Sequence, residues 1–223
     1  LTGVIISGMT GQDLIDFARI TDLQGFGPTL MAEKLEEIKD IRFSKETVRK
    51  MMIEVGGWKS KLKKKVEPHY ACARRNHRGV LVEIDGSEHV WLEERGTKAS
   101  LLVFVDDATS QILAAELFPE ESFFSYGNLC QRYFREHGLP QAFNSDRFSV
   151  FRVNRRDNLR YEPVTQFQRV LSALGIELIC ANSSQAKGRV ERVNQTLQDR
   201  LIKEMRLLGF NDYKNGQSIY SRR

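Results

Sequence analysis

The apolar run Leu101–Val105 constrains the fold of this chain more than any other stretch of its sequence. An unbroken apolar run bounded by turn-forming residues is typical of a strand buried in the middle of a sheet. Ile112–Phe118 follows across the polar residues 106–110 and is the expected hairpin partner. Upstream, apolar and polar residues alternate from Gly79 and predict a strand that ends with Asp85 at Gly86. Three consecutive strands are therefore expected.

Helical and strand-like segments alternate after these strands. A helix is expected over 122–137, and a short strand ending at Asp146 follows it. Thr165 can cap a helix that Gly175 stops, and Ile176–Cys180 has the pattern of another apolar strand. An amphipathic helix over 187–209 completes the series. The order β-β-β-α-β-α-β-α predicts an α/β domain over residues 79–210, with helices on the faces of a mixed sheet.

A small helix-turn-helix unit is expected ahead of this domain, over residues 26–58. Thr29 can cap a first helix and Ser44 a second, each with apolar residues at helical spacing. As a DNA-binding unit, it would present three cations of the second helix to the major groove, namely Lys45, Arg49 and Lys50. A purely structural helical hairpin is the alternative. Residues 1–25 fit no pattern and stay unassigned.

Basic segments flank an acidic one. Formal charges are −2 over residues 1–58, +7 over 59–78, −7 over 79–143 and +7 over 144–223. The segment 59–78 is expected to be a basic linker whose lysines can lie along a phosphate backbone, among them Lys63, Lys64 and Lys65. Cationic surfaces on both sides of a carboxylate-rich segment suit a polyanion, and ordinary solvated faces are the alternative reading.

Cysteine usage and hydropathy argue against several other classes. The chain has 3 cysteines, widely spaced, which gives little support to a disulfide framework and indicates a reducing cytosol. His69, Cys72 and His77 lack the fourth ligand that a structural zinc site needs. The sequence has no apolar run approaching ~18–20 residues and no signal-peptide pattern, so we expect neither a membrane span nor export.

Three carboxylates are candidates for a metal site. Asp85 and Asp146 end strand-like runs, and Glu191 lies one turn into the last helix, at the edge of its apolar stripe. Acids on two strands and one helix are what a divalent-metal phosphoryl-transfer site requires. A glutamate near a helix N-terminus is also a common stabilising feature, which is the alternative for Glu191. Rival acids lie nearby, and the last two of them favour a turn: Glu83, Asp106 and Asp107.

Four segments resemble the integrase catalytic core of bacterial insertion-sequence transposases, a retroviral-integrase-like family. They are Glu-Ile-Asp-Gly-Ser (83–87), Leu-Leu-Val-Phe-Val-Asp-Asp-Ala-Thr (101–109), Asn-Ser-Asp-Arg-Phe-Ser-Val-Phe-Arg-Val-Asn (144–154) and residues 176–194, which contain Lys-Gly-Arg-Val-Glu-Arg-Val-Asn. The resemblance covers about residues 26–210 and keeps the motifs in order. It implies a ribonuclease-H-like fold with a DDE triad of Asp85, Asp146 and Glu191.

The resemblance also implies a chemistry. The expected function is polynucleotidyl transfer: metal-dependent DNA strand cleavage and strand transfer during transposition of an insertion sequence. Two Mg²⁺ ions, for which Mn²⁺ substitutes, would be held by the triad, with Asp85 bridging both ions and Asp146 and Glu191 each completing one. The expected partners are double-stranded DNA, both element ends and target, and further copies of the chain, in the bacterial cytoplasm with the nucleoid.

Further contacts with DNA are expected around the second and third acids. The loop between them carries arginines suited to phosphate, among them Arg152, Arg155 and Arg156, and three cations flank Glu191, namely Lys187, Arg189 and Arg192. Phe148 and Phe151 either stack on a splayed base or anchor this loop to the core, and anchoring is favoured.

Other functions stay open at this point. One is a truncated, catalytically inactive DNA-binding remnant of a transposase, because residues 211–223 read as an unrelated tail where such enzymes continue into another domain. The other is a metal-dependent nuclease without strand transfer.

Overall fold

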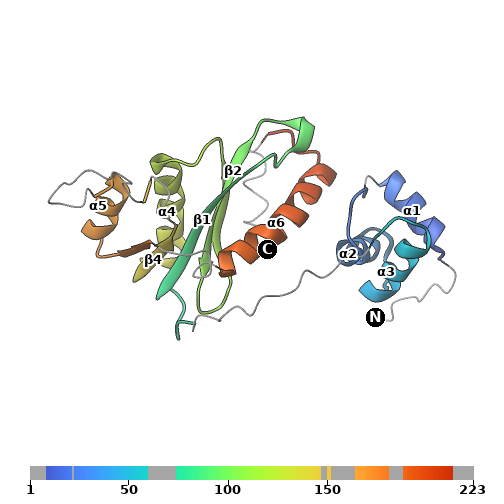
Figure 1. Cartoon of the computed structure of the whole chain (residues 1–223), viewed down its shortest axis with the longest axis horizontal. Helices are drawn as coiled ribbons and strands as arrows, with labels where there is room; N and C mark the ends of the chain where they lie inside the picture. The colour runs from blue at the N-terminus through green and yellow to red at the C-terminus, as the bar shows by residue number, and fades with distance from the viewer. Residues whose placement is uncertain are drawn as a thin grey trace. The chain divides into compact units, whose positions relative to one another are not determined.

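A computed structural model of the chain describes residues 9–21, 23–59, 74–146, 150–151, 164–180 and 188–212 (Figure 1). The chain divides into two compact units. The first comprises Leu1–Pro68 with Lys203–Gly209, and the second comprises His69–Ile202 with Phe210–Arg223. In the part of the chain that the structure describes, every helix is too short or too polar to cross a lipid bilayer.

Three helices form the first unit: α1 (Gly11–Ile20), α2 (Pro28–Lys39) and α3 (Lys45–Glu54). Each starts where local chemistry satisfies the free backbone N–H groups of a first turn. Thr10 and Asp13 form a capping box at α1, Pro28 begins α2, and the Ser44 hydroxyl accepts a bond from the backbone N–H of Thr47 at α3. The three helices share one apolar core, to which Leu14, Leu35 and Val48 contribute fully buried side chains.

The structure confirms the two helices expected in residues 26–58, and the DNA-reading role of this unit stays a prediction. It also shows α1 within residues 1–25, which the sequence pattern left unassigned. The signal for α1 was present in the capping pair Thr10 and Asp13, followed by Leu14 and Phe17 at helical spacing.

The second unit is built on a five-stranded sheet in the order β3-β2-β1-β4-β5. Its strands are β1 (Leu81–His89), β2 (Ala99–Asp106), β3 (Ile112–Phe118), β4 (Ala142–Ser145) and β5 (Glu177–Cys180), and a short 3₁₀ turn η1 (Glu93–Arg95) joins the first two. β1, β2 and β3 pair antiparallel, whereas β4 pairs parallel to both β1 and β5. All residues of β2 are buried, as expected for a central strand.

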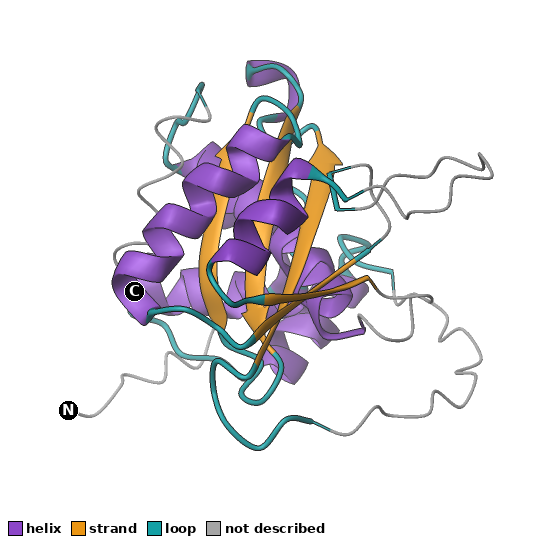
Figure 2. Ribbon diagram, turned by 90° about the vertical axis from the view of Figure 1, so that its left-hand side faces the viewer, coloured by secondary structure: helices purple, strands orange, loops and turns teal. Residues whose placement is uncertain are grey.

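Helices cover both faces of this sheet. α4 (Phe123–His137) and α5 (Gln166–Ala173) lie on one face, and α6 (Gly188–Leu207) lies on the other (Figures 1 and 2). Ser122 and Thr165 cap α4 and α5 with their hydroxyls, and Gly175, at φ 73°, follows the end of α5. The predicted mixed sheet with flanking helices is therefore confirmed.

The apolar core of the second unit lies between the sheet and the helices α4 and α5. Ile84 of β1, Phe104 of β2 and Phe143 of β4 are fully buried there, and Tyr126 and Tyr133 of α4 pack against them. Phe151 is also buried in this cluster, with its ring 4.7 Å from that of Tyr126. This contact fits the anchoring role that was favoured for Phe151, rather than stacking on a base.

The sequence pattern placed the end of β1 wrongly. The strand continues through Gly86 to His89, so Asp85 lies near its middle, opposite Val103 of β2. The reason is that β2 offers partners to every residue from Val82 to His89. Pairing with β2 along nearly the whole length of β1 outweighs the local turn tendency of Gly86 and Ser87.

Truncating Phe143 tests how much of the fold depends on the short strand β4. Its ring lies 5.4 Å from that of Phe104 and 6.1 Å from that of Tyr133, between centroids. We expect Phe143→Ala to lower the free energy of unfolding by about 3–5 kcal/mol, because it leaves a cavity in this cluster. Urea unfolding followed by circular dichroism measures the loss. Phe124→Ala, at a site that is 77% exposed, is the matched control and should change stability by less than about 0.5 kcal/mol.

Candidate active site

Two of the predicted carboxylates lie on neighbouring strands or directly after them. β1 pairs parallel with β4 up to Glu83 and Asn144, and Asp85 and Asp146 each follow two residues later in their own segments. Neighbouring strands lie ~4.8 Å apart. Asp85 is partly buried and Asp146, immediately after β4, is exposed. The structure therefore sets one carboxylate within β1 and a second just past the end of β4.

Helix α6 is attached to β1 by a ladder of polar contacts on one face of the sheet. The backbone N–H of Val190 donates to Glu83 Oε2 at 2.9 Å, Asn194 Nδ2 donates to Asp85 Oδ2 at 2.7 Å, and Gln198 Nε2 donates to Ser87 Oγ at 2.9 Å. The rungs are four residues apart on the helix and two residues apart on the strand. These steps correspond to ~6 Å and ~6.6 Å of rise, so the two elements can run side by side.

Asn194 contacts a predicted site residue, Asp85, and was not itself selected from the sequence. It is 7% exposed, and its bond to Asp85 fixes which end of the amide faces the carboxylate. Its other end, Oδ1, is buried without a hydrogen-bond partner among the described residues. A buried amide oxygen beside a carboxylate is a hard ligand of the kind that Mg²⁺ accepts. The sequence signal was its position, one turn after Glu191 on the same side of the helix.

Glu191 occupies the first turn of α6 and is exposed. It lies one turn before Asn194, on the helix side that approaches Asp85. Within the described residues, no group of three or more His, Cys, Asp or Glu side chains is arranged to hold a metal ion. Among the described residues, the structure thus carries Asp85 on β1, Asp146 just after the neighbouring β4 and Glu191 on the helix tied to β1, and it does not gather the three into one cluster.

The rival acids have structural roles. Asp106 is fully buried, and its carboxylate accepts bonds from the backbone N–H groups of Gly79 and Thr109 at 2.9 and 2.8 Å, which closes the turn after β2. Asp107 accepts from the backbone N–H of Arg75 at 2.6 Å and from the Arg189 guanidinium. These contacts confirm the turn that was favoured for this acidic pair.

Arg189 joins two buried carboxylates at the start of α6. Its guanidinium contacts Asp107 and lies 3.4 Å from Glu83, and its side chain is 12% exposed. Glu83 is 1% exposed, and burial raises its pKa above the ordinary range although the bond from Val190 and the charge of Arg189 oppose the rise. The sequence had placed Arg189 among the cations expected to contact DNA beside Glu191. In the structure it holds the first turn of α6 to the sheet, and the contact with DNA stays a prediction.

The other residues expected to contact DNA fall into two groups. Lys45, Lys50 and Arg192 are exposed, whereas Arg49 is partly exposed and its guanidinium Nε donates to Glu46 at 2.8 Å. The remainder lie outside the described residues: Lys63, Lys64, Lys65, Arg152, Arg155, Arg156 and Lys187.

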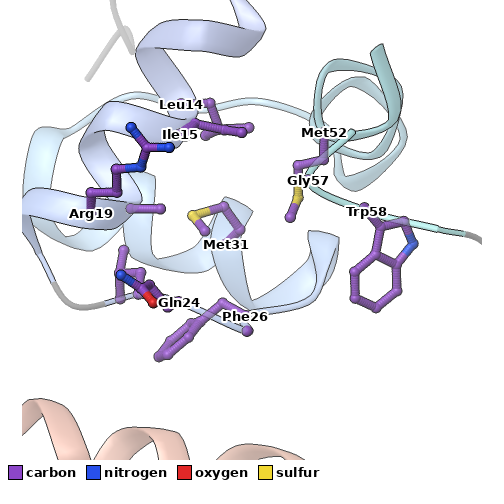
Figure 3. Close-up of a pocket in the computed structure, with 12 residues that line it drawn as sticks. Leu14, Ile15, Arg19, Gln24, Phe26, Met31, Met52, Gly57 and Trp58 are labelled. Carbon is purple, nitrogen blue, oxygen red and sulfur yellow. The ribbon is translucent and has the colours of Figure 1, made fainter. Parts of the chain in front are cut away.

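Two hollows differ in chemistry. One, of about 270 Å³ in the first unit, is lined by apolar side chains such as Met31, Met52 and Trp58, with Arg19 and Gln24 on its border (Figure 3). The other, of about 360 Å³ in the second unit, lies between α6 and the turn before β3, and its lining includes Arg74, Arg189 and Arg192. Arg74 and Arg192 give the second hollow cationic side chains of the kind that bind phosphate, whereas the charge of Arg189 is already engaged by Glu83 and Asp107.

Comparisons with known proteins agree with this geometry. No family model matches the chain. It is 49% identical over 197 residues to the putative transposase y4bF of Sinorhizobium fredii, which covers 88% of this chain and 43% of that protein. It is 35% identical over 144 residues to the transposase for insertion sequence IS1202 of Streptococcus pneumoniae, which covers 64% of this chain and 30% of that protein.

A solved structure shares the fold. In the intasome of simian T-cell lymphotropic virus in complex with the PP2A regulatory subunit B56 gamma, the similar chain has a TM-score of 0.51 and 16% sequence identity. The match covers 91% of this chain and 66% of that one. The sheet order and the flanking helices give the second unit the ribonuclease-H-like fold of that chain. By sequence the chain is related to the two transposases, and it spans less than half the length of either.

Removing Arg189 tests its structural role. We expect Arg189→Ala to lower the free energy of unfolding by about 3–5 kcal/mol at pH 8, because Glu83 and Asp107 would stay buried without their cation. The folded-state pKa of Glu83 would rise further, so this loss should be complete above that pKa and should shrink as the pH falls toward the ordinary value of a glutamate. Urea unfolding at pH 8 and pH 5 measures both effects.

Arg192→Ala is the matched control, since this arginine is exposed on the same helix. It should change stability by less than about 0.5 kcal/mol at either pH. An equal effect of the two substitutions would contradict the role assigned to Arg189.

Proposed function

We propose that this chain is the core of a DDE transposase that cleaves DNA strands at the ends of an insertion sequence and joins them to target DNA. The observation that carries the proposal is the Asn194 bond that ties the Glu191 helix to Asp85, together with the parallel pairing of β1 with β4, the strand that Asp146 follows. The sequence similarity to two transposases supports the same conclusion.

The residues present suit divalent magnesium, for which manganese substitutes. Asp85, Asp146 and Glu191 would supply carboxylate oxygens, and the buried Oδ1 of Asn194 is a further hard oxygen on the same side of α6. When two such ions are bound, they supply activation of the attacking oxygen and stabilisation of the leaving oxygen in an in-line displacement.

The chain's own residues position these groups and the substrate. The α6–β1 ladder fixes the distance between the strand that carries Asp85 and the helix that carries Glu191. In cleavage, a water oxygen attacks phosphorus and the DNA 3′-oxygen leaves as a hydroxyl. In strand transfer that hydroxyl attacks a target phosphate and displaces the 3′-oxygen of the target strand, which leaves as a hydroxyl in turn. Asn194 keeps the Asp85 carboxylate oriented during both steps, because its amide donates to one carboxylate oxygen.

Double-stranded DNA is the proposed partner. The arginine-lined hollow beside α6 and the cations of α3 would contact phosphates, as would the linker lysines and the loop arginines. We further propose that copies of the chain assemble on DNA, since joining two element ends to one target requires more than one active site, and that they act in the bacterial cytoplasm at the nucleoid.

Neutralising the triad tests the catalytic assignment. Asp85→Asn, Asp146→Asn and Glu191→Gln should each abolish Mg²⁺-dependent nicking of element-end duplexes while DNA binding persists, because each removes an anionic ligand without opening a cavity. Gel assays of nicked and joined products provide the measurement, and chelation with EDTA should stop the wild-type reaction. Asp199→Asn, on the exposed surface of α6, is the control.

Full nicking activity in any triad variant would remove that residue from the proposal. Nicked products without joined products would instead indicate a nuclease.

Substituting the α3 cations tests sequence reading by the first unit. Lys50→Ala and Arg49→Ala should reduce the preference for element-end over random DNA, because base edges are read from an exposed helix in the major groove. The size expected for each lost contact is about 1–3 kcal/mol of discrimination. Fluorescence anisotropy with both DNAs measures it. Lys39→Ala, in the last turn of α2, is the control, and a uniform loss on both DNAs would show a phosphate contact only.

A further inference from the structure

The carboxyl group of Glu121 occupies the space where residue 86 of β1 would carry a side chain. A Cβ atom at Gly86 would lie 2.4 Å from Cδ and Oε2 of Glu121 and 2.6 Å from Oε1. These separations are far shorter than van der Waals contact. Since successive residues of a strand face opposite sides, Asp85 and Glu121 flank β1 from its two faces, one residue apart along the strand.

A buried tyrosine connects Glu121 to the carboxylate pair. The hydroxyl of Tyr126, which is fully buried, donates to Glu121 Oε1 at 2.6 Å. Burial raises the pKa of Tyr126 well above its ordinary value, and the charges of Glu121, Asp85 and Asp146 raise it further. The hydroxyl therefore stays protonated and donates a hydrogen bond to Glu121. Glu121 bonds Tyr126 and lies against Gly86, the residue after Asp85, so it belongs to the same part of the sheet as Asp85.

A buried acceptor without a hydrogen-bond partner, on the α6 side of β1, independently indicates a ligand site beside Asp85. Asn194, which bonds Asp85, is more than nine-tenths buried, and its Oδ1 has no hydrogen-bond partner in the described part of the chain. A buried acceptor left in this way costs free energy unless a ligand or water satisfies it. A divalent cation beside Asp85 would do so.

We propose that Glu121 is a positioning residue of the cleavage site, whose charge behind β1 strengthens the hold of Asp85 and Asp146 on divalent cations. This inference depends on the proposed function, because it assigns Glu121 to the same site. Glu121 need not ligate an ion to act. Charges separated by a few ångströms of protein interior interact strongly, because the effective dielectric constant there is about 20 rather than about 80.

Two substitutions separate the charge of Glu121 from its shape. Glu121→Gln keeps an oxygen that accepts from Tyr126 and fills the same volume, so it removes the charge alone. Gly86→Ala keeps the charge and displaces the carboxyl group, which is the far end of a flexible side chain. Glu120→Gln is the matched control, since it removes one negative charge from the adjacent, exposed position.

The experiment measures Mn²⁺ binding to the full 223-residue chain without DNA, from the electron paramagnetic resonance signal of free Mn²⁺. We expect Glu121→Gln to weaken Mn²⁺ binding by about tenfold, as the loss of an outer partner of a metal site does. Gly86→Ala should weaken it in the same direction. The double variant should bind no worse than Glu121→Gln alone, because both changes act on one carboxyl group. Glu120→Gln should bind like the wild type.

Equal Mn²⁺ affinity in the wild type and Glu121→Gln would overturn the role of Glu121 and leave the proposed function standing. An equal loss in Glu120→Gln would overturn it too, because net charge alone would then account for the effect. If Glu121→Gln does not fold, Gly86→Ala reports on the same carboxyl group. Absence of Mn²⁺ binding by the wild type would overturn the inference and the proposed function together. Binding without nicking by the wild type would overturn the proposed function only.

Discussion

The three hydrogen bonds between α6 and β1 join parts of the second unit that lie 107 to 111 residues apart in sequence. They are the constraint on which the site depends, because Asp85 is on the strand and Glu191 is on the helix. The ion pairs of Arg189 with Glu83 and Asp107 hold the first turn of α6 in the same place. Without these contacts, the apolar stripe of α6 would hold it on the sheet without fixing where along β1 it lies, since hydrophobic burial has no direction.

Much of the fold could be predicted from the sequence because its strands and helices are encoded locally. The apolar run of β2 and the caps Ser44 and Thr165 identified elements that the structure contains, whereas α2 begins at Pro28 and is not capped by Thr29. The end of β1 could not be found in this way, because it is decided by pairing with β2 and not by the residues Gly86 and Ser87 themselves. Likewise, α1 begins at the capping pair of Thr10 and Asp13, a signal that the sequence prediction did not use.

The acids of the candidate site came from the resemblance to the integrase core, and the contacts around them did not. The catalytic roles of Asp85, Asp146 and Glu191 stay predictions, and the structure carries the first two on or directly after the neighbouring strands β1 and β4. The inward direction of Arg189 could not be predicted, because the two buried carboxylates that attract its side chain are distant in sequence. Glu121 and Asn194 are visible only once the strands are paired, since each acts on a residue distant in sequence.

The ladder between α6 and β1 combines two repeats that do not match. Four helical residues rise ~6 Å and two strand residues rise ~6.6 Å, so each further rung adds a misfit of ~0.6 Å. The three rungs contain two such steps, so the misfit accumulates to ~1.2 Å, or ~0.6 Å on either side of the central rung. This is about the ~0.5 Å range within which N–H···O distances are still good, so a longer ladder would lose its hydrogen bonds. The ladder therefore stays short, and its central rung is the bond between Asn194 and Asp85.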